Sequence, residues 1–158
     1  MRLEIEEIPA AVSRLLDLGQ APVAQAAQAI VQQEPALLVS VARGSSDHAC
    51  TYLKYASELL LGLPVASVGP SQASVYGAKL RLPNAVSLSE SQSGMSPDIV
   101  EMTRTAGAGG AATLALTNNA KSPLAAVADH IIDIQAGPET SVAATQTFVT
   151  SALAGLWV

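Results

Sequence analysis

Two short loops carry the groups of this sequence that are best suited to bind an anion. They are Arg43-Gly44-Ser45-Ser46 and Ser91-Gln92-Ser93-Gly94, and each follows an apolar run. Each loop offers hydroxyl groups and leads into an expected helix, whose first N–H groups and positive dipole end favour negative charge. Gly44 and Gly94 would let the backbone approach a ligand closely or turn with positive φ. Together, the two loops predict a phosphate-binding site.

The elements around these loops alternate between strands and helices. Apolar runs predict five strands, at residues 36–42, 64–68, 85–89, 112–117 and 130–134. Caps, prolines and glycines predict helices at 47–61, 97–107 and 141–157, a short helix after Ser122-Pro123 and a helical turn at 72–76. This alternation predicts an α/β protein, with a flavodoxin-like five-stranded parallel sheet in a three-layer α/β/α sandwich.

Two amphipathic helices are expected before this sandwich. Apolar residues recur at helical spacing up to Gly19, and Pro9 is expected to begin or kink that helix. A second helix is expected from Pro22 to Gln33. We therefore divide the chain into N-terminal helices at 1–35 and one α/β domain at 36–158.

The expected strand order places the two loops side by side. In a sheet of order 2-1-3-4-5, the loops after the first and third strands face each other at the point where the order reverses. Each loop alone could be an ordinary turn followed by a helix cap. Two such loops at one switch point favour the phosphate site instead. Arg43 could add a bidentate contact to the phosphate, or could be a solvated loop arginine.

Composition and motifs exclude several classes of protein. The net charge of −5 and an aromatic content of 3% argue against nucleic-acid binding, and the apolar runs are too short to span a membrane. One cysteine and two distant histidines, His48 and His130, predict no disulfide and no metal site. No Walker A, dinucleotide-binding or G-x-S-x-G motif is present, so we expect no cofactor. With no signal peptide, we expect a cytoplasmic protein.

An ordered set of motifs from residue 36 onward resembles the SIS (sugar isomerase) domain family. The similarity is greatest to the first SIS domain in the isomerase part of glucosamine-6-phosphate synthase and to related phosphosugar isomerases and deaminases. The segments that carry it are 42–46, 61–65, 91–94 with 96–98, 117–118 with 122–124, and 137–139 with 141–145. The resemblance implies that this domain is the first of two in a longer chain.

The resemblance also implies a ligand and the residues that hold it. The ligand would be a sugar phosphate, a hexose or hexosamine 6-phosphate. Its phosphate would be bound by Ser91, Gln92, Ser93, Gly94 and Ser96. The sugar phosphate would also contact Arg43, Gly44, Ser45, Ser46 and Val142. The main catalytic groups of the synthase-type enzymes lie in the second SIS domain, the carboxyl tail or another subunit.

Three positions depart from the family pattern. Glu90 stands where relatives usually have an apolar residue, so a carboxylate ends a buried strand. Met95 replaces a glutamate and Gln146 replaces a lysine, which removes charges near the site. Glu139 is the candidate catalytic acid or base, with a role at the start of the last helix as the alternative.

Three functions remain open from the sequence. The first is a sugar-phosphate-binding domain of an aldose–ketose isomerase or amino-sugar-phosphate deaminase. The second is a non-catalytic sugar-phosphate sensor, which the replaced charges at Met95 and Gln146 favour. The third is a degenerate structural domain, against which the intact segment 91–94 argues. The apolar Leu156 and Trp157 predict a homodimer or pairing with a second SIS domain.

Overall fold

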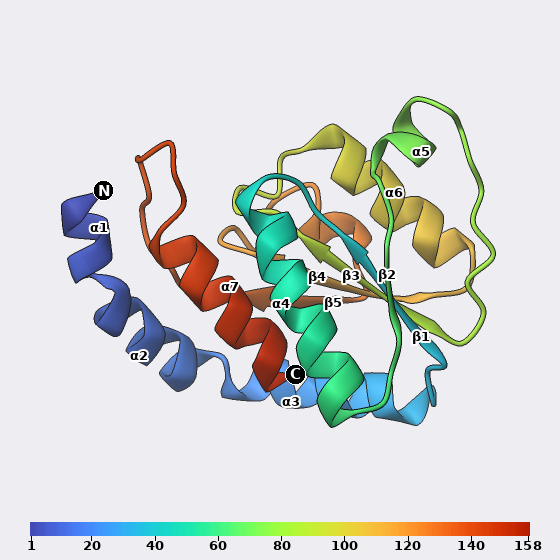
Figure 1. Ribbon diagram of the computed structural model, residues 1–158, viewed down its shortest axis with the longest axis horizontal. Coiled ribbons are helices and arrows are strands. Elements are labelled where there is room, and N and C mark those ends of the chain that lie inside the picture. The colour runs from blue at the N-terminus through green and yellow to red at the C-terminus, as the bar shows by residue number, and fades with distance from the viewer.

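A five-stranded parallel sheet forms the centre of the computed structural model, which describes residues 1–158 (Figure 1). The strand order is β2-β1-β3-β4-β5, as the sequence predicts. The strands are β1 (Leu37–Val41), β2 (Val65–Ser67), β3 (Ala85–Glu90), β4 (Ala112–Thr117) and β5 (His130–Asp133). Every residue of β3 and β4 is buried, because helices cover both faces of the sheet there. The fold class is thereby confirmed.

Each face of the sheet packs against its own set of helices. On one face lie α5 (Ser71–Ser74), α6 (Pro97–Ala108) and the short 3₁₀ helix η1 (Ala125–Val127). On the other lie α3 (Gln20–Gln32), α4 (Ser45–Leu60) and α7 (Gln146–Trp157), and Figure 1 shows α4 and α7 side by side. Met102 and Ile99 centre the first core, while Leu53, Leu116 and Ile132 belong to the second.

The N-terminal region has three helices, where the sequence predicts two. They are α1 (Arg2–Glu6), α2 (Ile8–Leu18) and α3. Pro9 separates the first two because it has no N–H to donate to Ile5 and its ring crowds that carbonyl. Pro22 is tolerated because it lies in the first turn of α3, where no N–H donor is needed.

The last helix begins later than predicted. The expectation of a helix at 141–157 is wrong at its start, because α7 begins at Gln146. The N–H groups of Thr140 and Ser141 donate to the Glu4 carboxylate, and those of Thr145 and Thr147 donate to Glu139. These carboxylates hold the preceding segment in a non-helical path.

The remaining boundaries lie close to the predicted ones. The helix after Ser122 is reduced to η1, and α4 begins at Ser45, two positions before the predicted Asp47. None of the helices combines the length and the apolar character needed to cross a bilayer.

Candidate functional site

A small polar cavity lies where the strand order reverses between β1 and β3. Its volume is about 70 Å³, and hydroxyl, amide and carboxyl groups form much of its lining. The lining comes from the amino end of α4, the end of β3 with the loop that follows, the segment before α7 and the first turns of α7. The residues are Ser45, Ser46, Glu90, Gln92, Glu139, Ser141, Val142, Ala144, Thr147, Phe148 and Ser151. The two predicted loops therefore meet at one cavity.

The loop after β3 is shaped by its own hydroxyl groups and by one glycine. The N–H of Gly94 donates to the Ser91 hydroxyl at 3.2 Å, and the N–H of Met95 donates to the Ser93 hydroxyl at 3.2 Å. Gly94 has a φ of +64°, and a Cβ there would overlap the buried Ser122 side chain. The path of this loop thus requires glycine at position 94.

The side chains of this loop point to different surroundings. Ser91 is buried, Ser93 is exposed, and Gln92 reaches the cavity. Ser96 stands at the N-cap of α6 with an extended backbone, and its hydroxyl makes no capping hydrogen bond. The hydroxyl of Ser96 is therefore available to a ligand at the positive end of α6.

The loop after β1 begins α4 and is linked to α6. Gly44 has a φ of +61° and precedes Ser45 and Ser46, which both line the cavity. The Arg43 guanidinium forms an ion pair with Asp98 in the first turn of α6. Arg43 does not line the cavity, and its charge instead links the loop after β1 to the start of α6.

Glu139 holds the start of α7. Its carboxylate accepts hydrogen bonds from the N–H of Thr145 at 2.7 Å, from the Thr145 hydroxyl at 2.8 Å, and from the N–H and hydroxyl of Thr147. Partial burial raises the pKa of Glu139, but the hydrogen bonds from Thr147 and Thr145 outweigh it, so the net pKa is lowered. The alternative role at the helix start is confirmed, while the catalytic role stays a prediction.

Glu4 shapes the cavity although it lies at the opposite end of the sequence. Its carboxylate accepts hydrogen bonds from the N–H of Thr140 at 2.7 Å, from the N–H of Ser141 at 3.0 Å and from both hydroxyls. The N-terminal amine, followed by these hydrogen bonds from Ser141 and Thr140, lowers the pKa of Glu4. The sequence patterns that predict the two loops do not include Glu4. The sequence holds one signal for the burial of Glu4: at helical spacing it falls on the same face as Ala11 and Leu15, which are both buried.

Glu90 ends β3 at the inner wall of the cavity. Its side chain is only 1% exposed, and the Cys50 thiol donates to its Oε2 at 3.8 Å. Burial raises the pKa of Glu90 to about 7, although hydrogen bonds from Ser151, Ser46 and Cys50 act in the opposite direction. The pKa of Glu90 is thus raised, whereas that of Glu139, which lines the same cavity, is lowered.

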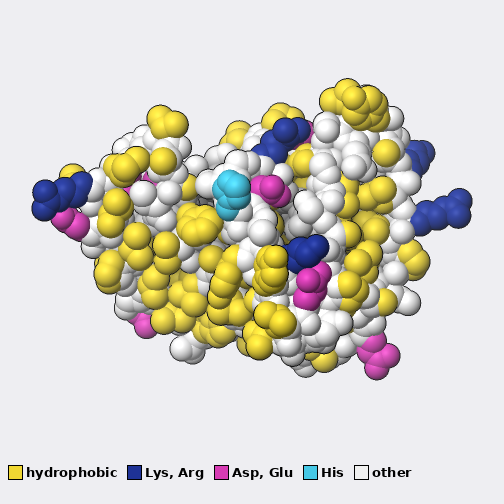
Figure 2. Space-filling model, viewed as in Figure 1, with side chains coloured by type: hydrophobic (Ala, Val, Ile, Leu, Met, Phe, Trp, Pro, Cys, Tyr) yellow, Lys and Arg dark blue, Asp and Glu magenta, His cyan; other side chains and the backbone are white.

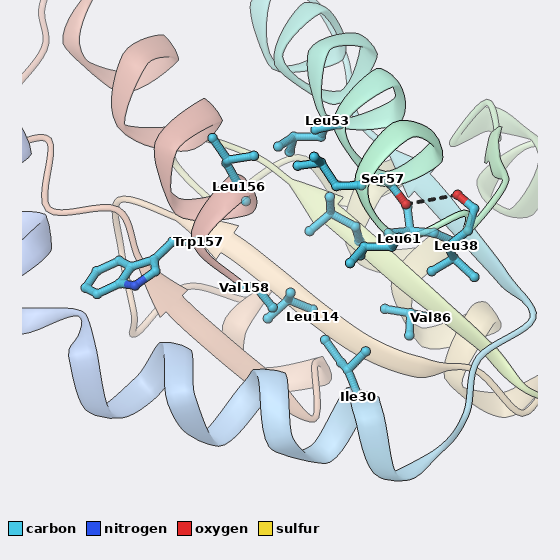
Figure 3. Close-up of a pocket in the computed structure, with 15 residues that line it drawn as sticks. Ile30, Leu38, Leu53, Ser57, Leu61, Val86, Leu114, Leu156, Trp157 and Val158 are labelled. Carbon is cyan, nitrogen blue, oxygen red and sulfur yellow. Dashed lines mark hydrogen bonds between the residues drawn. The ribbon is translucent and has the colours of Figure 1, made fainter.

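A second, apolar cavity lies at the other ends of α4 and α7 (Figure 3). Its volume is about 220 Å³, and Leu53, Leu114 and Leu156 project toward it. Ser57 adds no free polar group, because its hydroxyl donates to the Leu63 carbonyl at 3.0 Å. Figure 2 shows hydrophobic side chains gathered on the outer face that α4 and α7 share. The exposed ones on and just after α4 are Tyr52, Tyr55, Leu59, Leu60 and Leu61.

A family model decides where this chain belongs. The model of the SIS domain matches residues 33–156. The chain belongs to the SIS domain family. The match contains both predicted loops, the cavity residue Glu90 of β3 and nearly all of α7.

Individual relatives agree with this membership. A solved protein from Silicibacter pomeroyi, described as a proposed phosphosugar isomerase, is 66% identical with a TM-score of 0.97 and covers 99% of this chain and 48% of its own. The C-terminal domain of glucosamine-fructose-6-phosphate aminotransferase from Francisella tularensis is 26% identical with a TM-score of 0.83, over 97% and 44% of the two chains. The glutamine–fructose-6-phosphate aminotransferase of Halobacterium salinarum is 40% identical over 75% of this chain. This SIS domain spans about half the length of the Silicibacter pomeroyi chain and 20% of the length of the Halobacterium salinarum aminotransferase.

The fold brings together part of the predicted site of this SIS domain. Of the predicted residues, Ser45, Ser46, Gln92, Glu139 and Val142 line the cavity. The others lie in the adjoining loops, at Arg43, Gly44, Ser91, Ser93, Gly94 and Ser96. The cavity hydroxyls of Ser141, Thr147 and Ser151 were not among the predicted site residues. No group of three or more His, Cys, Asp or Glu side chains is placed to hold a metal ion.

Proposed function

We propose that this SIS domain binds a hexose or hexosamine 6-phosphate at the polar cavity. One observation carries the proposal: the loops after β1 and β3 meet there, and each leads into a helix. The amino ends of α4 and α6 supply N–H groups and positive dipole ends that favour a phosphate. The relatives described as phosphosugar isomerase and fructose-6-phosphate aminotransferases support the choice of ligand.

The phosphate would bind to the loop after β3 rather than deep in the cavity. Ser93 is exposed there, and the Ser96 hydroxyl is free of capping. Two carboxyl groups, Glu90 and Glu139, line the cavity itself and would repel a phosphate dianion. The hydroxyl groups of the sugar would then face those carboxyls, together with Ser45 and Val142.

We also propose that the domain serves an aldose–ketose isomerase or an amino-sugar-phosphate deaminase in the cytoplasm. The free, buried Cys50 is compatible with a reducing compartment. The alternative is a non-catalytic sugar-phosphate sensor, favoured by the uncharged Met95 and Gln146. The sensor would bind the same ligand without turnover, so an isomerisation assay distinguishes the two.

The exposed apolar surface of α4 and α7 supports a proposed pairing with a second SIS domain. That domain would belong to another copy or to the same longer chain. Leu156 and the exposed leucines near the end of α4 would be buried on pairing. Size-exclusion chromatography with light scattering tests self-association, and a monomer at micromolar concentration would argue against the homodimer.

A thermal-shift panel tests ligand binding. Fructose 6-phosphate, glucosamine 6-phosphate and inorganic phosphate are compared with the unphosphorylated sugars. A ligand at about 100 times its Kd should add roughly 2.7 kcal/mol of stability. The shift should shrink in the double variant Ser93→Ala/Ser96→Ala and persist in Ser13→Ala, a matched change on the exposed face of α2. No shift with any phosphate would refute the proposed ligand class.

A further inference from the structure

Two carboxyl groups line the polar cavity in opposite surroundings. The Glu139 carboxylate accepts hydrogen bonds from backbone N–H groups and hydroxyls of Thr145 and Thr147. Glu90, at the end of β3, lines the same cavity and is almost completely buried. When two titratable groups in one site have pKa values shifted apart, the pair can divide the acid–base roles between them.

Glu139 is poorly suited to exchange a proton with a ligand. Its oxygens are occupied by the donors that begin α7, and its pKa is held below its usual value because those hydrogen bonds outweigh its burial. Taking up a proton would weaken the start of that helix. The carboxylate is therefore a structural anion that remains ionised at neutral pH.

Glu90 has the opposite environment. No lysine, arginine or histidine lines the cavity, so no cation stabilises its charge. The titratable groups near it are Cys50 and Asp47 from α4 and Glu139, which lines the same cavity, whereas α7 contributes no titratable group to the lining. Burial is the main cause that raises the pKa of Glu90 to about 7, and the charge of Asp47 adds to it. A carboxyl that titrates near neutral pH is suited to act as both base and acid.

We propose that Glu90 is the catalytic acid–base residue of this cavity, transferring a proton between adjacent carbons of an open-chain sugar phosphate. The proposal rests on the proposed function, because it needs the sugar phosphate to bind first. Starting from an aldose, the Glu90 carboxylate takes the proton from C2, and the C2–H electrons form the C1–C2 double bond of an enediol. The carbonyl oxygen on C1 becomes a hydroxyl.

The second half of the step returns Glu90 to its carboxylate form and completes the conversion without net oxidation or reduction. Protonated Glu90 returns its proton to C1, and the O2 hydroxyl loses its proton as C2 becomes the carbonyl carbon. O1 takes its proton from water and O2 releases one to water, so these two transfers balance. No oxidant or reductant is required, and Glu90 ends as the carboxylate that began the cycle.

Cys50 acts in this proposal as a positioning residue. Burial, followed by the neighbouring charge of Glu90, raises the pKa of its thiol, so the thiol stays protonated. It can then donate to Oε2 of Glu90, as the 3.8 Å distance between sulfur and oxygen indicates. This bond holds the carboxyl from the side of α4, in addition to the hydrogen bonds from Ser46 and Ser151.

Proton exchange with solvent tests the role of Glu90. The protein is incubated in D₂O with fructose 6-phosphate or glucosamine 6-phosphate, and the C1 and C2 proton signals of the sugar are followed by NMR. We expect deuterium incorporation by the unchanged protein and a loss of about 100-fold or more in Glu90→Gln. The rate should rise with pH through about 7, because only the ionised carboxylate is a base.

Matched variants separate chemistry from folding and binding. Glu101→Gln removes an acid on α6 that pairs with Arg104 at the surface, and it should leave exchange unchanged. Glu90→Gln should fold and, above pH 8, unfold at a higher temperature than the unchanged protein, because it removes a buried charge. Cys50→Ala should move the pH midpoint of exchange upward, and Cys50→Ser should restore it, since the serine hydroxyl can donate in place of the thiol.

The outcomes distinguish the acid–base role of Glu90 from the proposal that the cavity binds a sugar phosphate. Thermal stabilisation by a sugar phosphate without deuterium exchange would overturn the role of Glu90 and leave the binding site intact. Undiminished exchange in Glu90→Gln would overturn it as well. Absence of binding would refute the proposed function and, with it, the acid–base role.

Discussion

The two ends of the α4–α7 pair form cavities of opposite character. At the amino ends, Ser46, Thr147 and Ser151 line a polar cavity of about 70 Å³ that also holds two carboxyl groups. At the carboxyl ends, Leu60 and Leu156 line an apolar cavity of about 220 Å³. A helix offers unpaired N–H donors at its amino end, so the polar cavity lies where an anion is favoured. The same helix pair thus lines a polar cavity toward its amino ends and an apolar cavity toward its carboxyl ends.

The largest expected effect comes from the apolar end. Leu53→Ala should destabilise the protein by about 3 kcal/mol, because it removes a buried side chain that packs against Gly155 and widens an existing cavity. Urea unfolding measures the change. Thermal stabilisation by a sugar phosphate should keep its size, and its loss would show that the two ends are coupled rather than separate.

A glycine substitution at the polar end should lower the free energy of unfolding by nearly as much. Gly94→Ala should destabilise by about 2 kcal/mol, since its Cβ would overlap Ser122 at a positive φ. It should also abolish the shift with sugar phosphates. Gly77→Ala is the control, because its φ is +63° but nothing lies within 4 Å of the added Cβ. Equal losses in both variants would contradict the claim that contact with Ser122 requires this glycine.

Removing the cap of α7 should have a smaller effect. Glu139→Gln is expected to cost about 1 kcal/mol at pH 7, because it weakens the hydrogen bonds to Thr145 and Thr147. The folded-state pKa of Glu139 is lowered, so this stabilisation is present above the pKa of the unfolded state and disappears as the pH falls through the folded one. Unfolding curves should therefore differ most between the two proteins at pH 7, and the difference should shrink as the pH is lowered through the acidic range. A difference that keeps its size as the pH falls would mean that the charge is not what holds the helix start.

The smallest effect on stability is expected at the outer face. Leu60 is 72% exposed, so Leu60→Lys should change the free energy of unfolding by less than about 0.5 kcal/mol. It should nevertheless weaken self-association, which light scattering measures. Leu18→Lys on α2, at 61% exposure, is the control. If both variants remained as associated as the unchanged protein, the face of α4 would not be the pairing surface.

The sheet could be predicted because its signals are local. The buried runs that became β3 and β4 contain no charged residue before Glu90, and cap-plus-proline signals marked the helix after β3. The strand order then followed from the general rules for parallel sheets, and with it the meeting of the loops at Ser46 and Gln92.

The rest depended on contacts between distant segments. Glu4 binds Thr140 and Ser141 across more than 130 residues, and no local pattern predicts that pairing. The late start of α7 follows from the same contacts. Glu90 was recognisable as an unusual acid at the end of a strand, but only the fold places it beside Cys50 and against a cavity.

An NMR titration of the backbone amides with fructose 6-phosphate tests the central claim most directly. If the polar cavity is the ligand site, amides of residues 44–46 and 91–96 should shift together and saturate with one Kd, while those around Leu61 and Leu156 stay unchanged. Unphosphorylated fructose should produce no comparable shift. Shifts centred on the apolar cavity, or none at either end, would contradict the assignment of ligand binding to the amino ends of α4 and α6.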